Sequence, residues 1–183
     1  MVGKTRTIRK LLFSFALVTV CGFAFGQNDW IKKEIGNNVF VSFPNSPTFK
    51  FTNKAGTYTS KTDNCIFVAI AQQDPFPNYS DFVKLPVENQ KKLIEMFLDN
   101  AIKGMLTQSA NDGTPFKNIT IGKYPGREAS YSAINPVTGN RTTKYVRLFY
   151  ALNVVYAFQS FSTQDGKSCT DEKNTFLNSI TAN

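Results

Sequence analysis

The most informative absence in this sequence of 183 residues is histidine, which does not occur at all. Without histidine there is no Ser-His or Cys-His nucleophile pair and no imidazole general base. The usual nitrogen ligand of zinc is missing too, and the chain has only three cysteines. We therefore expect no metal site and no catalysis of the kind that depends on an imidazole.

The glycine patterns of nucleotide binding are also lacking. Neither a P-loop nor a dinucleotide-binding fingerprint is found, so we expect no cofactor. A hydrolase built on two carboxylates needs no histidine, and Asp63, Asp74, Asp81 and Glu128 leave that function open. Because 13 acidic residues form some pairs by chance, we rank this carboxylate-dependent hydrolase last.

The first 26 residues have the pattern of a secretory signal peptide. Four basic residues precede an apolar run over 11–25, and Ala24 and Gly26 provide the small residues of a cleavage site before Gln27. The run is shorter than the roughly 20 residues that span a bilayer, so we expect cleavage and export to the periplasm or the extracellular space. The alternative is a lipoprotein acylated at Cys21, although Val20 stands where that processing usually has a small residue.

Much of the positive charge belongs to this leader. The chain has 21 Lys and Arg against 13 Asp and Glu, and removing the four in the leader leaves 17, or a net charge of about +4. The remaining lysines are scattered and form no arginine-rich groove for nucleic acid. We expect a monomer without a nucleic-acid partner, and leave peripheral association with the cell envelope open.

Two cysteines, Cys65 and Cys169, remain in the exported chain. Exported proteins meet an oxidising environment, so we predict a disulfide between them. A bridge that closes about 100 residues of chain would contribute about 4–5 kcal/mol in the chain-entropy model. The alternative is two buried thiols. No linker divides residues 27–183, which we expect to form a single domain.

Two amphipathic helices are predicted. Over residues 88–106 apolar side chains recur at helical spacing, which is typical of a helix packed on a sheet. On its polar face, Asp99 and Lys103 form a favourable i,i+4 pair. Ser168 and Asp171 resemble a capping box that opens a final helix. The residues of this helix that we expect to face inward are Phe176, Leu177 and Ile180.

The rest of the chain predicts short strands separated by turn residues. They are expected at residues 39–43, 65–71, 117–124, 127–134, 142–151 and 154–161. Pro125-Gly126 would form one turn and Leu152-Asn153 another, and such short connections require antiparallel pairing. Both faces of the last hairpin are apolar, so each needs a cover. The expected fold class is α+β, with a central antiparallel β-sheet flanked by helices in an α/β/α sandwich.

Several sequence segments, in their order along the chain, resemble the PsbP-like proteins and their exported bacterial relatives. They are VFVSFPNSP, DFVKLPVENQKKLIEMFLDNAIKGML, GKYPGREASY, RLFYALNVVYAFQ and FLNSI. The likeness covers most of residues 38–180. It implies a central antiparallel sheet flanked by helices and, as in the plant members, an accessory role at a membrane complex. The resemblance implies no catalytic residue.

The stretch KYPGREASY places Arg127 beside Glu128 in a predicted strand. Alternation puts these two side chains on opposite faces, so they cannot pair with each other. The structural interpretation, which we favour, is a cross-strand ion pair of Glu128 with Arg147 or Lys144, worth about 0.2–1 kcal/mol if exposed. The functional interpretation is a recessed cluster that orients acidic or hydroxyl groups of a ligand. Its candidate residues are Arg127, Glu128, Tyr131, Tyr145 and Arg147.

These observations favour an exported, non-catalytic accessory or interaction domain with an unknown protein or small-molecule partner. The alternative is a binding protein for a small apolar or acidic ligand, held in a pocket between sheet and helix. The 17 Phe and 7 Tyr are enough to line such a pocket as well as a core.

Overall fold

The computed structural model describes residues 30–76, 78–107, 115–164 and 168–183. The expected signal peptide, its cleavage site before Gln27 and the alternative lipid-anchor residue Cys21 lie outside these ranges. In the described ranges, no helix is both long and apolar enough to cross a membrane.

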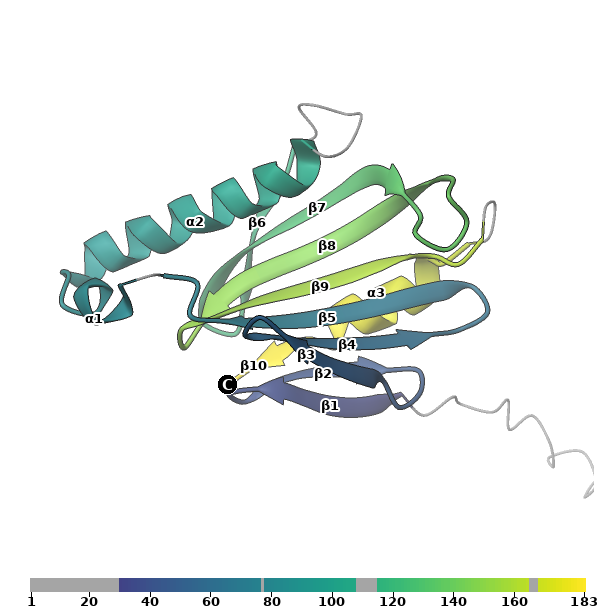
Figure 1. The fold of residues 1–183 in the computed structure, drawn as a ribbon, viewed down its shortest axis with the longest axis horizontal. Coiled ribbons are helices and arrows are strands. Elements are labelled where there is room, and N and C mark those ends of the chain that lie inside the picture. Colours follow the sequence, from purple (N-terminus) through teal and green to yellow (C-terminus); the bar gives the residue numbers. More distant parts are fainter. Residues whose placement is uncertain (1–29, 77, 108–114, 165–167) are drawn as a thin grey trace, which may run out of the picture.

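Runs of consecutive strands are separated by helices along the chain, as Figure 1 shows. The elements are β1 (Ile31–Gly36), β2 (Val39–Phe43), β3 (Thr48–Thr52), β4 (Ala55–Lys61), β5 (Cys65–Gln73), α1 (Tyr79–Phe82), α2 (Val87–Thr107), β6 (Lys117–Ile121), β7 (Tyr124–Ile134), β8 (Arg141–Ala151), β9 (Val154–Ser162), α3 (Thr170–Asn178) and β10 (Thr181–Ala182). The predicted long helix is confirmed as α2. The strands β1, β3, β4 and β10 were not predicted from the sequence.

The strands form two antiparallel sheets. The central sheet has the order β3-β4-β5-β9-β8-β7-β6, and a smaller sheet has the order β1-β2-β10. Every strand pair of the described residues is antiparallel, and for consecutive strands the short connections predicted this. The structure is therefore a mixed α+β fold, in which β3 and β6 are the two edges of the central sheet.

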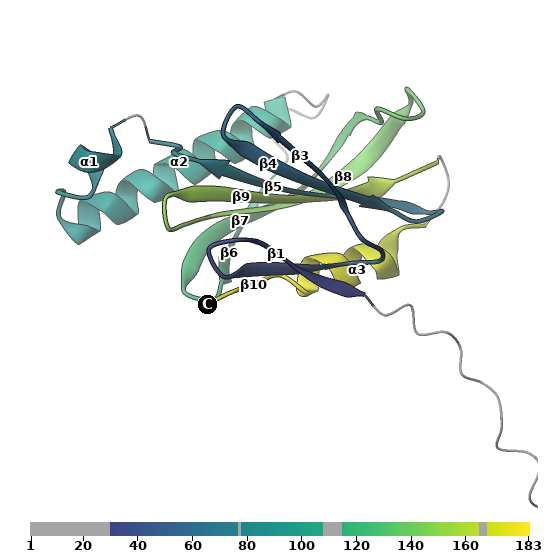
Figure 2. The same ribbon diagram turned by 60° about the horizontal axis from the view of Figure 1, so that its bottom comes forward.

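Each face of the central sheet is covered, as the apolar alternation of the last hairpin required. Leu98 and Ile102 of α2 pack on one face against Val146 and Leu148 of β8. The other face packs against α3 and the smaller sheet, and Phe176 of α3 is completely buried there. Figure 2 shows α2 on one side of the sheet and α3 with the smaller sheet on the other. The second cover thus combines a helix with strands.

The predicted disulfide is present and joins the central sheet to α3. Cys65 begins β5 and Cys169 directly precedes α3, with their Cα atoms 5.4 Å apart. This separation lies within the usual range for disulfides. Cys169 stands at the N-cap, so the capping box predicted from Ser168 and Asp171 is wrong: no side chain hydrogen-bonds the cap position.

The turn predicted at Pro125-Gly126 is also wrong. The chain turns at Gly122-Lys123, where Gly122 has a φ of +60°, and both Pro125 and Gly126 belong to β7. The pairing of β7 with β8 begins only at Gly126. Pro125 is therefore paired with β6 on one side and with no residue of β8 on the other. A proline without a backbone N–H is tolerated at such a place.

A candidate ligand-binding cleft

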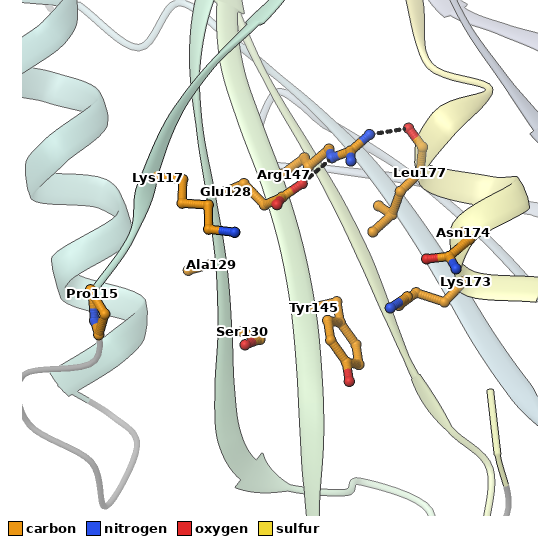
Figure 3. A pocket seen from close by; sticks show the side chains of 10 residues that line it. All are labelled: Pro115, Lys117, Glu128, Ala129, Ser130, Tyr145, Arg147, Lys173, Asn174 and Leu177. Carbon is orange, nitrogen blue, oxygen red and sulfur yellow. Dashed lines mark hydrogen bonds and ion pairs between the residues drawn. The ribbon is translucent and has the colours of Figure 1, made fainter. Parts of the chain in front are cut away.

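A cleft of about 270 Å³ lies between α3 and the strands β6, β7 and β8 (Figure 3). Its lining residues are Pro115, Lys117, Glu128, Ala129, Ser130, Tyr145, Arg147, Lys173, Asn174 and Leu177. The strand pairing explains why several of these side chains meet. Glu128 of β7 stands opposite both Lys117 of β6 and Arg147 of β8, while Ser130 stands opposite Tyr145.

Glu128 and Arg147 form the centre of this cleft. Arg147 Nε donates a hydrogen bond of 2.5 Å to Glu128 Oε2, and the side chains of Arg147 and Glu128 are 24% and 29% exposed. The predicted cross-strand pair is therefore present with Arg147. Lys144, the other expected partner, lies on the opposite face of the sheet, over the ring of Phe161 at 4.9 Å from its centroid.

Arg147 also reaches the end of α3. Its Nη1 donates a 2.7 Å hydrogen bond to the backbone oxygen of Leu177 and a 3.3 Å bond to Asn178 Oδ1. The last carbonyl groups of a helix lack partners within the helix, and a cation is favourable beside them. Arg147 thus joins β7, β8 and the C-terminal end of α3, which is the role of a structural joint.

Two lysines leave the cleft with excess positive charge. Lys173 Nζ lies 4.1 Å from the centroid of the Tyr145 ring, a distance typical of a cation–π contact. In the described parts of the chain, neither Lys173 nor Lys117 takes part in an ion pair. Because Arg147 already balances Glu128, the cleft carries two cations without a carboxylate partner.

The remaining candidates, Arg127 and Tyr131, do not belong to this cleft. They lie on the face of the sheet that packs against α2, where Arg127 is only 5% exposed. Arg127 Nε donates a 2.6 Å hydrogen bond to Asp99 Oδ1 of α2, so Asp99 pairs across elements and not with Lys103 as its spacing suggested. Burial raises the pKa of the Tyr131 hydroxyl. Of the five candidate residues, Glu128, Tyr145 and Arg147 therefore lie on the cleft face of the sheet, and the other two lie on the α2 face.

Sequence reasoning missed the two cleft lysines and Asn174. Lys117 comes from β6, and Lys173 and Asn174 come from α3, which follows β9 in the sequence. One signal was available for Lys173, since it precedes the buried Leu177 by four residues and shares its helix face. Lys117 has no such signal, because only the β6–β7 register places it opposite Glu128.

The charged groups that the described residues bring to the cleft are one ion pair and two lysines. Among the described residues that line the cleft, Glu128 is the only carboxylate, and it is engaged by Arg147. Asp74 and Asp81, considered above for a two-carboxylate hydrolase, pair instead with Lys54 and Lys84 on the surface. Among the described residues, no three acidic or cysteine side chains are grouped to hold a metal ion.

Comparisons with known proteins add little to this description. No family model matches the chain, and no curated protein matches it. A similar solved structure is a crystal structure at 1.50 Å resolution of a protein from Bacteroides thetaiotaomicron VPI-5482, with a TM-score of 0.45 and 13% sequence identity. The match covers 83% of this chain and 48% of that one, so this chain spans about half of that protein. At this similarity the match carries no argument about function.

Proposed function

We propose that the protein is an exported, non-catalytic interaction domain whose cleft binds an anionic group of its partner. The observation that supports this function is the charge imbalance of the cleft. Lys117 and Lys173 face an open space in which Glu128, the one carboxylate of the described lining, is already paired. An incoming carboxylate or phosphate would meet uncompensated positive charge, with Asn174 and the Tyr145 hydroxyl available to orient it.

Export is part of the same proposal. The leader pattern supports it, and the Cys65–Cys169 disulfide indicates an oxidising environment. We also keep the PsbP-like α/β/α sandwich, the single domain over residues 27–183 and an accessory role at the cell envelope as proposals. The packing of α2 on one face of the sheet and of α3 on the other supports that fold type.

A second candidate function is the carriage of a small free acid in the same cleft. The size of the cleft favours it, because about 270 Å³ accommodates a small acid better than a long apolar ligand. Leu177 and the ring of Tyr145 would contact an apolar part of such a ligand. This candidate differs from the first only in whether the anionic group is free or belongs to a macromolecule.

Titration with benzoate and with inorganic phosphate, followed by NMR, tests the cleft. We expect shifts in β7, β8 and α3, and binding weakened about two- to fivefold by Lys117→Gln or Lys173→Gln, since each removes one partly screened charge. Lys103→Gln is the matched control, because Lys103 is an exposed lysine of α2 outside the cleft. Equal weakening by all three variants would refute a specific site.

A native mass spectrum of the protein exported from its own host separates the two candidates. A reproducible additional mass that Lys173→Gln loses would favour the small acid. A bare protein, combined with a partner in envelope crosslinking that wild type captures and Lys173→Gln does not, would favour the interaction domain. If the spectrum shows no extra mass and crosslinking finds no such partner, both functions fail.

A further inference from the structure

The strand β3 is an unprotected edge of the central sheet. It is the terminal strand of the sheet order, pairs with β4 alone, and all five of its residues are exposed. Every second residue of an edge strand directs its backbone N–H and C=O groups away from the sheet. These groups form a template on which another extended segment can add by hydrogen bonding.

Two aromatic rings lie exposed on this edge. Phe49 and Phe51 are each 57% exposed, and their spacing places both on the same face of β3. Phe49 packs on Tyr58 of β4 with ring centroids 4.7 Å apart. Gly56 makes room for the pair, since a Cβ atom there would lie 3.1 Å from the Phe49 ring and 3.9 Å from the Phe51 ring. The result is an apolar surface of neighbouring rings beside a free strand edge.

The charge of this edge is entirely positive. Residues 48–61, which contain both β3 and β4, include Lys50, Lys54 and Lys61 and no acidic residue. Lys54 pairs with Asp74, but Lys50 and Lys61 have no ion pair within the described chain. Lys50 lies between the two phenylalanines and points to the opposite face of the strand.

We propose that β3 is the docking edge for an extended segment of another protein, in which a carboxylate stands between two apolar residues. The segment would pair with β3 as an additional antiparallel strand. Its apolar side chains would cover Phe49 and Phe51, and its carboxylate would face Lys50. This inference rests on the proposed role as an interaction domain and adds a second contact surface for a protein partner. It is independent of the cleft, which lies near the other edge of the sheet.

A second copy of this chain fits the same edge poorly. Antiparallel self-pairing centred on Lys50 would place the two Lys50 side chains directly opposite each other, and like charges in that position are destabilising. Shifting the register by two residues avoids the contact but leaves part of this five-residue strand unpaired. Lys50 therefore opposes self-association while favouring an acidic partner strand.

The test uses two blocked peptides, Ac-Thr-Val-Glu-Val-Thr-amide and Ac-Thr-Val-Lys-Val-Thr-amide, titrated into the exported protein and followed by NMR. We expect shifts in β3 and β4 and a preference of about two- to tenfold for the glutamate peptide. Lys50→Glu should reverse that preference. Lys92→Glu, at an exposed lysine of α2, should leave it unchanged.

Three controls make the result decisive. Phe49→Ser should weaken both peptides, while a Lys117→Gln, Lys173→Gln double variant should still bind the glutamate peptide, which separates this edge from the cleft. Absence of peptide binding, shifts confined to β6, or a preference that Lys50→Glu does not reverse would overturn the proposal. Binding through β3 to phosphatidylserine-containing vesicles but to neither peptide would also overturn it, in favour of a membrane surface.

Discussion

Arg147 shows how one side chain can connect three elements. Its guanidinium contacts Glu128 of β7 and the Leu177 carbonyl of α3, while its own backbone lies in β8. Removing Glu128 would leave a partly buried cation with one partner fewer, which costs more than losing an exposed ion pair. The stability of this joint is therefore measurable by mutation.

We predict that Glu128→Gln lowers the free energy of unfolding by about 1–2 kcal/mol, measured by urea denaturation. Asp74→Asn is the matched control, because the Lys54–Asp74 pair is exposed on the surface and should contribute less than about 1 kcal/mol. Combining Glu128→Gln with Arg147→Met should cost less than the sum of the single changes. Additive effects would show that the two side chains are not coupled.

Two buried tyrosines make the fold sensitive to alkaline pH. Burial raises the pKa of both Tyr150 and Tyr156 to about 12, and the Tyr156 hydroxyl donates a 3.0 Å hydrogen bond to the Gly36 carbonyl. The folded-state pKa lies above the reference value of 10.0, so the folded protein holds these protons more tightly than the unfolded chain. The resulting stabilisation is complete below pH 10 and is lost as the pH rises towards 12.

We therefore predict a steep loss of stability between about pH 10 and pH 12. Urea denaturation at a series of pH values measures it. Tyr156→Phe should flatten this slope, at a cost of about 1 kcal/mol near neutral pH from the lost hydrogen bond. If stability falls with pH equally in wild type and in Tyr156→Phe, the alkaline sensitivity does not come from Tyr156.

At the scale of single elements, β7 departs most from its sequence pattern. Pro125-Gly126 has the composition of a turn, yet both residues are part of the strand. Gly126 is required because strands pass closely there: a Cβ atom would lie 2.7 Å from the Leu148 oxygen and 3.1 Å from Phe149 Cβ. In α2, by contrast, a Cβ atom at Gly104 would meet no atom within 4 Å.

These two glycines give opposite predictions for the same substitution. Gly126→Ala should destabilise the protein by about 1–3 kcal/mol, because backbone and core atoms would have to move. Gly104→Ala should stabilise it by about 0.5–1 kcal/mol, because alanine restricts the unfolded chain and favours helix. Thermal denaturation of both variants tests the pair. A stable Gly126→Ala variant would mean that β7 and β8 are not packed as described.

At the scale of the whole molecule, the disulfide links the central sheet to α3, which packs on one of its faces. Cys65 lies in the interior strand β5, and Cys169 begins the helix that buries Phe176 against the same face. The bond spans 104 residues of sequence. It therefore closes a long loop, from β5 to the start of α3, in the unfolded state, and the restriction of the unfolded chain is largest for long loops.

We predict that the double variant Cys65→Ser, Cys169→Ser loses about 2–5 kcal/mol of stability. Wild type in reductant should approach the stability of this variant, while the variant itself should not respond to reductant. Calorimetry with and without reductant provides the measurement. If reductant leaves wild-type stability unchanged under denaturing conditions, the bond does not carry this stabilisation.

The sequence by itself determined the local features whose cause lies within a few residues. The α2 stripe, the Leu152-Asn153 turn and the two apolar faces of the β8–β9 hairpin were all predictable because periodicity and turn chemistry are local properties. The separation of Arg127 from Glu128 was predictable for the same reason. The pairing of Cys65 with Cys169 was predictable because these are the two cysteines that follow the expected leader.

Only the tertiary structure decided which distant groups meet. Arg127 faces Asp99, Glu128 faces Arg147, and Lys173 of α3 lies over the ring of Tyr145, because strand register and helix placement set these contacts. The exposed edge at β3 likewise depends on the strand order, which local patterns do not encode. Contacts between distant residues depend on how the whole core packs, and that physical dependence is why both candidate surfaces required the folded molecule.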